Sequence, residues 1–208
     1  RTMKEAMDET RILSTLEVKI CMQILGVEEW NYFPIASEEE NLDQRILEAF
    51  LRLVEMGFLE SCGGGYRRTQ QMEEVFAQAV QPEFTMQILK KESMPLVVTG
   101  NRENMVVLET ISVQEGKVRV YHTDQERIWR YLNEFSGEQK AEKSMADLSG
   151  ASRVENSDIA IKLEKGQQDS LLYIWQSDTG KKYLKNGEQK ETTLEKEIFW
   201  KLLEGEDR

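Results

Sequence analysis

The chain has 208 residues, and its 38 acidic residues outnumber its 27 lysines and arginines, giving a formal net charge of -11. With 39% hydrophobic and 31% charged residues, the composition is that of a folded globular protein and excludes an intrinsically disordered chain. One histidine and two cysteines exclude a multi-histidine metal centre and argue against a disulfide scaffold. No apolar run approaches the roughly 20 residues that span a bilayer, and no signal-peptide pattern opens the chain. We therefore predict a cytoplasmic protein with reduced thiols.

The acidic balance bears on the class of partner. Non-specific affinity for DNA comes mainly from lysines and arginines that displace counterions from the phosphates. An anionic membrane surface attracts basic segments in the same way. The net charge of -11 therefore disfavours nucleic acid and membrane partners, although a local basic patch could still bind DNA.

The first predicted helix begins at a capping box. Ser14 and Glu17 have the S-x-x-E spacing, apolar residues recur every four positions behind them, and Gly26 follows as a stop. This pattern predicts a helix over 15–25. The preceding segment is either helical or contains a short strand at 11–13.

A loop with three aromatic residues follows over 27–41. Trp30, Tyr32 and Phe33 could form an edge that binds a partner. Alternatively, they form a lid that packs on the chain's own core. We favour the lid.

The next elements are a helix, a hairpin and a helix. A broad apolar stripe predicts a helix over 42–56, formed by Ile46, Leu47, Phe50, Leu53 and Val54. Strand-like segments flank the glycine run at 63–65 and predict a hairpin. Thr69 then caps a helix that extends to about residue 80.

This order resembles a winged helix over about 14–80. A helix that reads DNA presents Arg, Lys, Asn or Gln to the bases. The exposed side of the helix before the hairpin instead carries more carboxylates than arginines, so we favour protein binding over DNA binding. The DNA-binding alternative would use Arg45, Arg52, Arg67 and Arg68.

After Pro82 the hydrophobic period changes from 3.6 to 2, which indicates strands. Strands, a hairpin and an amphipathic helix occur at about 84–137 and again at about 159–205, and the two sets could share one antiparallel sheet. We predict an α+β protein with a winged-helix-like part followed by two strand-hairpin-helix units. The predicted divisions are 1–82, 83–137, a possible linker at 138–150, and 151–208.

The sequence contains no recognisable catalytic constellation. His122 is the only histidine, and we interpret it as a solvated residue at a strand end. No nucleotide-binding or zinc motif is present, and the glycines at 63–65 lack the lysine of a phosphate-binding loop. We predict no catalytic residue, no metal site and no cofactor. An enzyme with paired carboxylates stays a third interpretation.

The features between Leu16 and Phe135 resemble the EspG-like chaperones that accompany type VII (ESX) secretion systems, and their uncharacterised relatives in Gram-positive bacteria. The resemblance rests on Leu16-Glu17-Val18 leading to Leu25-Gly26, Leu53–Glu60, the helix at 72–80, Pro82-Glu83-Phe84, and the strand pair ending at Val120. It implies a cytoplasmic, non-enzymatic adaptor with a mixed α/β fold that holds helical secretion substrates.

The resemblance also implies that apolar residues contact the tip of a helical hairpin of the partner. The candidate contact residues are aromatic side chains whose burial the sequence leaves open: Trp30, Tyr32, Phe33, Tyr66, Trp129 and Trp200. We therefore expect an adaptor or chaperone that binds a protein partner. The alternative is a winged-helix transcriptional regulator.

Overall fold

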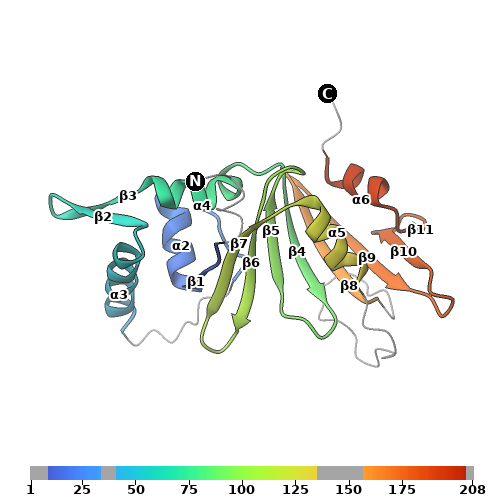
Figure 1. Cartoon of the computed structure of the whole chain (residues 1–208), viewed down its shortest axis with the longest axis horizontal. Coiled ribbons are helices and arrows are strands. Elements are labelled where there is room, and N and C mark those ends of the chain that lie inside the picture. The colour runs from blue at the N-terminus through green and yellow to red at the C-terminus, as the bar shows by residue number, and fades with distance from the viewer. Residues whose placement is uncertain (1–8, 34–40, 135–156, 205–208) are drawn as a thin grey trace. The chain divides into compact units, whose positions relative to one another are not determined.

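The computed structural model describes residues 9–33, 41–134 and 157–204 (Figure 1). Within these residues the chain forms five helices and eleven strands, whose pairings are antiparallel wherever a register is defined. The predicted α+β class is therefore confirmed. None of the helices in these ranges is both long enough and apolar enough to cross a lipid bilayer.

The chain divides into two compact units. The first comprises Arg1–Gln81 and Leu108–His122, and the second comprises Pro82–Val107 and Thr123–Arg208. This division differs from the predicted one, because strands from 83–137 and 151–208 pair within a single sheet. The possible linker at 138–150 lies outside the described residues.

The first unit contains a cluster of helices and two sets of paired strands. Its elements are β1 (Arg11–Ser14), α2 (Thr15–Ile24), α3 (Leu42–Glu55), β2 (Leu59–Cys62), β3 (Gly65–Arg68), α4 (Gln70–Val80), the end of β6 (Met105–Ser112) and β7 (Lys117–Thr123). β1 pairs with β7, and β2 pairs with β3. Of the two possibilities for the segment before α2, the short strand is the observed one.

Local signals position the helices of the first unit. The predicted capping box is present: the Ser14 side chain accepts from the Glu17 N–H, and the Glu17 side chain accepts from the Ser14 N–H. At the start of α4, the Thr69 side chain accepts a hydrogen bond from the backbone N–H of Met72. α3 ends at Glu55, and Gly57 follows its C-cap residue with a left-handed φ of +79°; a Cβ at this position would lie 2.9 Å from Gln71 Oε1. A glycine is therefore needed where the chain turns from α3 into the hairpin.

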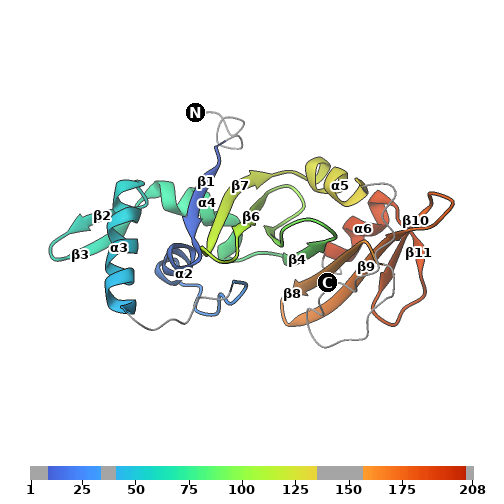
Figure 2. The same ribbon diagram turned by 90° about the horizontal axis from the view of Figure 1, so that it is seen from below.

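The second unit is a sheet with two helices. Its elements are β4 (Phe84–Lys90), β5 (Leu96–Gly100), the start of β6, α5 (Gln125–Asn133), β8 (Ile159–Lys165), β9 (Gln168–Gln176), β10 (Lys182–Asn186), β11 (Thr192–Thr193) and α6 (Lys196–Leu203). The strand order β5-β4-β8-β9-β10-β11 is antiparallel throughout. Figure 2 shows β8, β9 and β10 side by side. The two predicted sets of strands share one sheet, joined at the β4–β8 pair.

Apolar rows across this sheet form the core of the second unit. Ile88 of β4 pairs with Ile161 of β8, which pairs with Leu172 of β9, and all three side chains are fully buried. Such cross-strand rows fix the register, because a slip of one residue would move each apolar side chain to the other face.

Two lysines on this sheet bind the carboxyl end of α5. Lys90 Nζ of β4 donates to the Tyr131 carbonyl at 2.7 Å, and Lys182 Nζ of β10 donates to the Asn133 carbonyl. The last carbonyls of a helix lack partners within the helix, and a positive charge there also complements the helix dipole. The lysines therefore hold α5 against its sheet.

The starts of both helices in this unit correct the prediction. The spacing of Thr123 and Glu126 predicts a capping box that begins at Thr123, yet Asp124 caps α5 and its side chain accepts from the Arg127 N–H. The run Thr192-Thr193-Leu194-Glu195 predicts the start of the last helix, yet Thr192 and Thr193 form β11 and α6 begins at Lys196.

The buried face of α6 also differs from the predicted one. The spacing of the apolar residues predicts that Leu194, Ile198 and Leu202 point inward, with Phe199 as a fourth candidate. Leu194 and Phe199 are buried as predicted, but Ile198 is exposed, and the fully buried residues of α6 are Phe199, Trp200 and Leu203. Both sets have near-helical spacing. The observed choice removes the larger aromatic surfaces from water, which is the greater hydrophobic gain.

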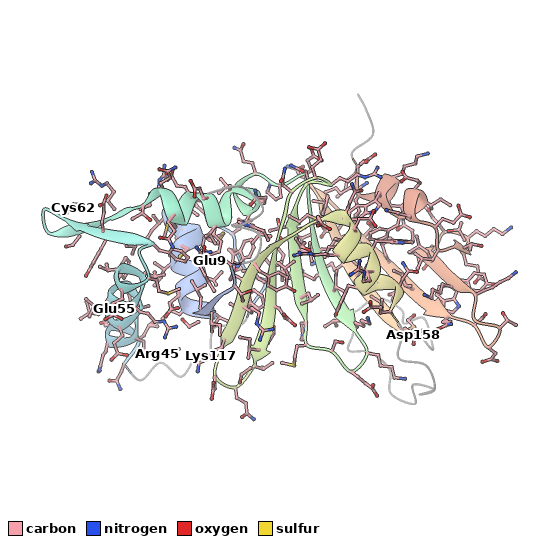
Figure 3. All side chains as sticks on the ribbon, in the orientation of Figure 1. Glu9, Arg45, Glu55, Cys62, Lys117 and Asp158 are labelled. Atoms are coloured by element: carbon pink, nitrogen blue, oxygen red, sulfur yellow. The ribbon has the colours of Figure 1, made fainter. Side chains whose placement is uncertain are left out.

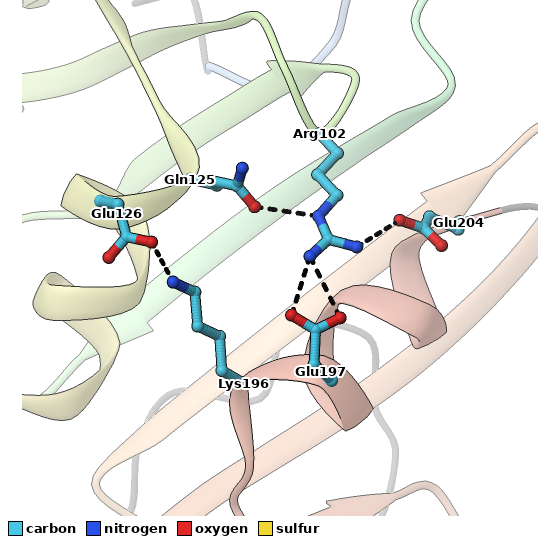
Figure 4. Close-up of polar contacts among 6 residues, drawn as sticks. All are labelled: Arg102, Gln125, Glu126, Lys196, Glu197 and Glu204. Atoms are coloured by element: carbon cyan, nitrogen blue, oxygen red, sulfur yellow. Dashed lines mark hydrogen bonds and ion pairs between the residues drawn. The ribbon is translucent and has the colours of Figure 1, made fainter.

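Arg102 joins α5 and α6 (Figure 4). Its guanidinium donates to Gln125 Oε1 at 2.9 Å, to Glu204 Oε1 at 2.7 Å and to both carboxylate oxygens of Glu197. A guanidinium group is planar and carries five N–H donors, so one arginine can bind these three acceptor residues at the same time. The guanidinium carbon also lies 5.9 Å from the Trp200 ring centroid, which helps to cover the buried indole.

Candidate functional site

An exposed row of apolar side chains runs along α3. Leu47, Phe50, Leu51 and Val54 have the i, i+3, i+4, i+7 spacing that places residues on one helix face. Leu47 is 54% exposed and Leu51 is 50% exposed, while Phe50 and Val54 are half-buried. The buried residues of α3 are Ala49 and Leu53, on the neighbouring face. The apolar arc of α3 is therefore wider than the part that its own core covers.

The hairpin adds an aromatic ring to this row. Tyr66 of β3 is 40% exposed, and its ring stacks on Phe50 with centroids 5.0 Å apart and planes 28° from parallel. The contact ties the hairpin to α3, beside which it lies in Figure 1. We call the set Leu47, Phe50, Leu51, Val54 and Tyr66 the α3–β3 surface.

Carboxylates line this surface. Asp43 lies one turn before Leu47 on the same row, and Glu48 and Glu55 flank Leu51. All three are exposed, and none belongs to the ion pairs found in the described part of the chain. Glu48 accepts a hydrogen bond from Gln44. Figure 3 marks Glu55 and Arg45 on α3. Arg52 lies next to Glu48 and Glu55, but its guanidinium pairs with Glu17, so the carboxylates dominate the rim of the α3–β3 surface.

Most of the arginines proposed for DNA contact already bind carboxylates. Arg52 Nε lies 3.1 Å from Glu17 Oε1, Arg67 Nε lies 2.7 Å from Glu60 Oε1, and Arg68 Nε lies 2.7 Å from Glu73 Oε1. Arg52 and Arg68 also donate to the backbone carbonyls of Ile12 and Ile24, respectively.

The remaining arginine of the DNA-binding alternative, Arg45, is half-buried on α3. A helix that reads bases would present such donors outward without competing acceptors. The guanidinium groups of Arg52, Arg67 and Arg68 instead pair with carboxylates of the first unit.

The aromatic loop is divided between core and surface. Trp30 is 5% exposed and packs edge-on against Tyr32, with ring centroids 4.6 Å apart. Tyr32 and Phe33 are half-buried. Trp30 is therefore a core residue, because its burial leaves no surface for a partner, and its burial agrees with the lid interpretation.

The two tryptophans predicted in the second unit also differ from each other. The sequence leaves the burial of Trp200 open; the side chain is fully buried and cannot contact a partner. Trp129 is half-buried, with its ring 6.0 Å from that of Phe199. Of the six predicted contact residues, Tyr66 is the one that lies on the exposed α3–β3 surface.

Sequence reasoning missed the leucines of this surface. Leu47 was assigned to the buried stripe of the helix, and Leu51 was not assigned to any face. The available signal was the width of the apolar arc, since apolar residues occupy more than half of the helix circumference. A second aromatic pair was also missed: Trp175 of β9 and Tyr183 of β10 stack with centroids 5.8 Å apart.

The titratable residues considered for chemistry have structural partners. His122 is half-buried, and its Nε2 lies 3.0 Å from the Val75 carbonyl, so it donates there and is not the solvated residue expected. Burial raises the pKa of the Cys21 thiol, which makes Cys21 a packing residue rather than a nucleophile. Across the described ranges, no three His, Cys, Asp or Glu side chains cluster in a way that could hold a metal.

Comparison with known proteins adds no family to these observations, because neither a family model nor a curated protein matches the chain. The resemblance to the EspG-like chaperones stays a prediction.

Proposed function

We propose that this chain is a cytoplasmic adaptor or chaperone that binds another protein through the α3–β3 surface. The observation that carries the proposal is the exposure of Leu47 and Leu51, each about half exposed, beside the stacked Tyr66. Contiguous exposed apolar side chains with a polar rim are typical of protein interaction sites. Binding would remove this apolar area from water, which supplies the driving force for association.

The chemistry of the surface favours a protein over a nucleic acid. Its rim is acidic, and a phosphate backbone would be repelled by Asp43, Glu48 and Glu55. Aromatic and apolar residues surrounded by polar ones are the usual composition of a protein interface. The resemblance to the EspG-like family extends the proposal to helical substrates of type VII secretion as the class of partner.

The test is affinity capture with matched surface variants. The double variant Leu47→Ser/Leu51→Ser removes the apolar row, and the control Val113→Ser/Met94→Ser removes two exposed apolar side chains elsewhere. Wild type and control should recover the same discrete protein from cells that make the chain naturally, and the double variant should recover at least about tenfold less. Equal recovery by all three proteins would contradict the proposal.

The alternative, a winged-helix transcriptional regulator, predicts a different result. Binding to a DNA fragment would weaken steeply between low and high salt, because phosphate contacts release counterions. It would also weaken in Arg67→Gln/Arg68→Gln. Salt-dependent DNA binding that survives Leu47→Ser/Leu51→Ser would favour the regulator over the adaptor.

A further inference from the structure

The charges around the α3–β3 surface indicate which kind of partner binds there. This inference rests on the proposed function. The apolar row extends from Leu47 to Val54, about 10 Å along the helix axis at 1.5 Å per residue. Tyr66 stands beside this row on the hairpin, where it stacks on Phe50. A row of this spacing forms a ridge, and ridges pack into the grooves of a second helix.

The rim adds a requirement on the partner's charge. Asp43 lies beyond one end of the row, and Glu48 and Glu55 lie along the side that faces away from the core of the first unit. A partner that covers Leu51 brings its own flanking residues next to these carboxylates. Lysine or arginine there would be attracted, whereas aspartate or glutamate would be repelled.

We propose that the occupant of the α3–β3 surface is an amphipathic helix with a leucine-rich stripe flanked by lysines or arginines. The stripe covers Leu47, Leu51 and Tyr66, and the basic flank lies against Glu48 and Glu55. Basic amphipathic helices that dock in this manner form a general class of recognition segment.

A second copy of the chain fits this surface less well. A twofold contact places the same surface on both sides of the interface. Self-association through α3 would therefore bring two sets of Asp43, Glu48 and Glu55 together, and Arg52, the nearby exposed cation, already pairs with Glu17.

Three designed helical peptides test the proposal. They share leucines at i, i+3, i+4 and i+7 and differ only at the flanking positions, which are all lysine, all glutamine or all glutamate. Fluorescence anisotropy measures their binding to the full chain at low and high salt. The lysine peptide should bind roughly tenfold more tightly than the glutamine peptide at low salt, the glutamate peptide should bind least, and salt should narrow the differences.

Two variants assign the effect to this surface. Leu47→Ser/Leu51→Ser should abolish binding of the lysine and glutamine peptides. Asp43→Asn/Glu48→Gln/Glu55→Gln should remove the preference for lysine while leaving the affinity for the glutamine peptide unchanged. Circular dichroism and thermal melting of both variants serve as folding controls, and all substituted side chains are exposed.

The outcomes separate this inference from the proposed function. Equal binding of the three peptides, or a lysine preference that survives the triple variant, would overturn the basic helix yet leave the surface a protein-binding site. Concentration-dependent dimerisation that Leu47→Ser/Leu51→Ser abolishes would overturn it in favour of a second copy. If no peptide binds, the basic helix is wrong, and affinity capture with the leucine variants still decides the proposed function.

Discussion

The ring of Tyr66 on the hairpin stacks on the ring of Phe50 on α3, with centroids 5.0 Å apart. The β2–β3 pair is a separate two-stranded sheet, and isolated hairpins of this size are marginally stable in water. Tyr66 therefore has two roles: it attaches the hairpin to α3, and it completes the exposed apolar row.

This stack should contribute measurably to stability. Tyr66→Ala is expected to lower the free energy of unfolding by about 1 kcal/mol, because an aromatic pair is worth about 0.5–1.5 kcal/mol beyond its buried area. Urea denaturation of Tyr66→Ala, Phe50→Ala and the double variant measures the coupling. Strictly additive effects would contradict a direct interaction between the two rings.

The exposed leucines of α3 should be dispensable for folding. Leu47→Ser and Leu51→Ser are expected to change the free energy of unfolding by no more than about 0.5 kcal/mol each, since they are about half exposed in the folded state. Leu53→Ala, at a fully buried position on the same helix, should cost about 2–5 kcal/mol. A large cost at Leu47 would mean that it belongs to the core, as the sequence pattern had suggested.

The buried carboxylate of Glu17 should make stability depend on pH. Burial raises its pKa above the ordinary value of 4.5, although its hydrogen bond from the Ser14 backbone and the nearby Arg52 guanidinium act in the opposite direction. The folded state therefore holds the proton more tightly than the unfolded state. Proton binding by Glu17 therefore stabilises the folded state. This stabilisation is complete below about pH 4.5 and is lost as pH rises through the folded-state pKa of Glu17.

Glu17→Gln isolates this contribution. The amide oxygen can still accept from the Ser14 N–H, so the helix cap is retained. Between about pH 4.5 and pH 7, the free energy of unfolding should fall more for wild type than for Glu17→Gln. Other carboxylates act equally in both proteins, so parallel pH profiles in urea titrations would show that Glu17 does not titrate in this range.

Arg102 should control local opening of α6. In Arg102→Lys, one ammonium group replaces a fork that binds Gln125, Glu197 and Glu204 at once. Amide hydrogen exchange across 196–203 should become faster, while exchange in β4 stays at the wild-type rate. Arg127→Lys, the same change at an exposed position of α5, serves as the control. Unchanged exchange in α6 would contradict this role of Arg102.

Local signals predicted the elements of this fold better than the faces that the elements bury. The capping box at Ser14 and Glu17 and the cap at Thr69 located two helices, because these contacts form within one turn of the chain. Period-2 alternation at 84–88 located β4. The faces that these elements bury depend on tertiary packing, and the errors about Leu47 and Trp200 arose there.

Leu47 and Trp200 show this limit from opposite sides. Leu47 lies in an apolar arc wider than the face that α3 buries, so periodicity alone placed it inside. Trp200 lies off one apolar stripe of α6 and on another, so periodicity left its burial open and made it a candidate contact residue, although it is fully buried. The sequence pattern shows which side of a helix is apolar. It does not show how much of that side a neighbouring element will bury.

Site-specific photocrosslinking tests the central claim most directly. A photoreactive amino acid at position 51, on the α3–β3 surface, is compared in the native host with the same residue at position 94, an exposed apolar site in the second unit. The account predicts a covalent adduct with a discrete protein from position 51 and no such adduct from position 94. Adducts with nucleic acid at position 51, or the same products from both positions, would contradict it.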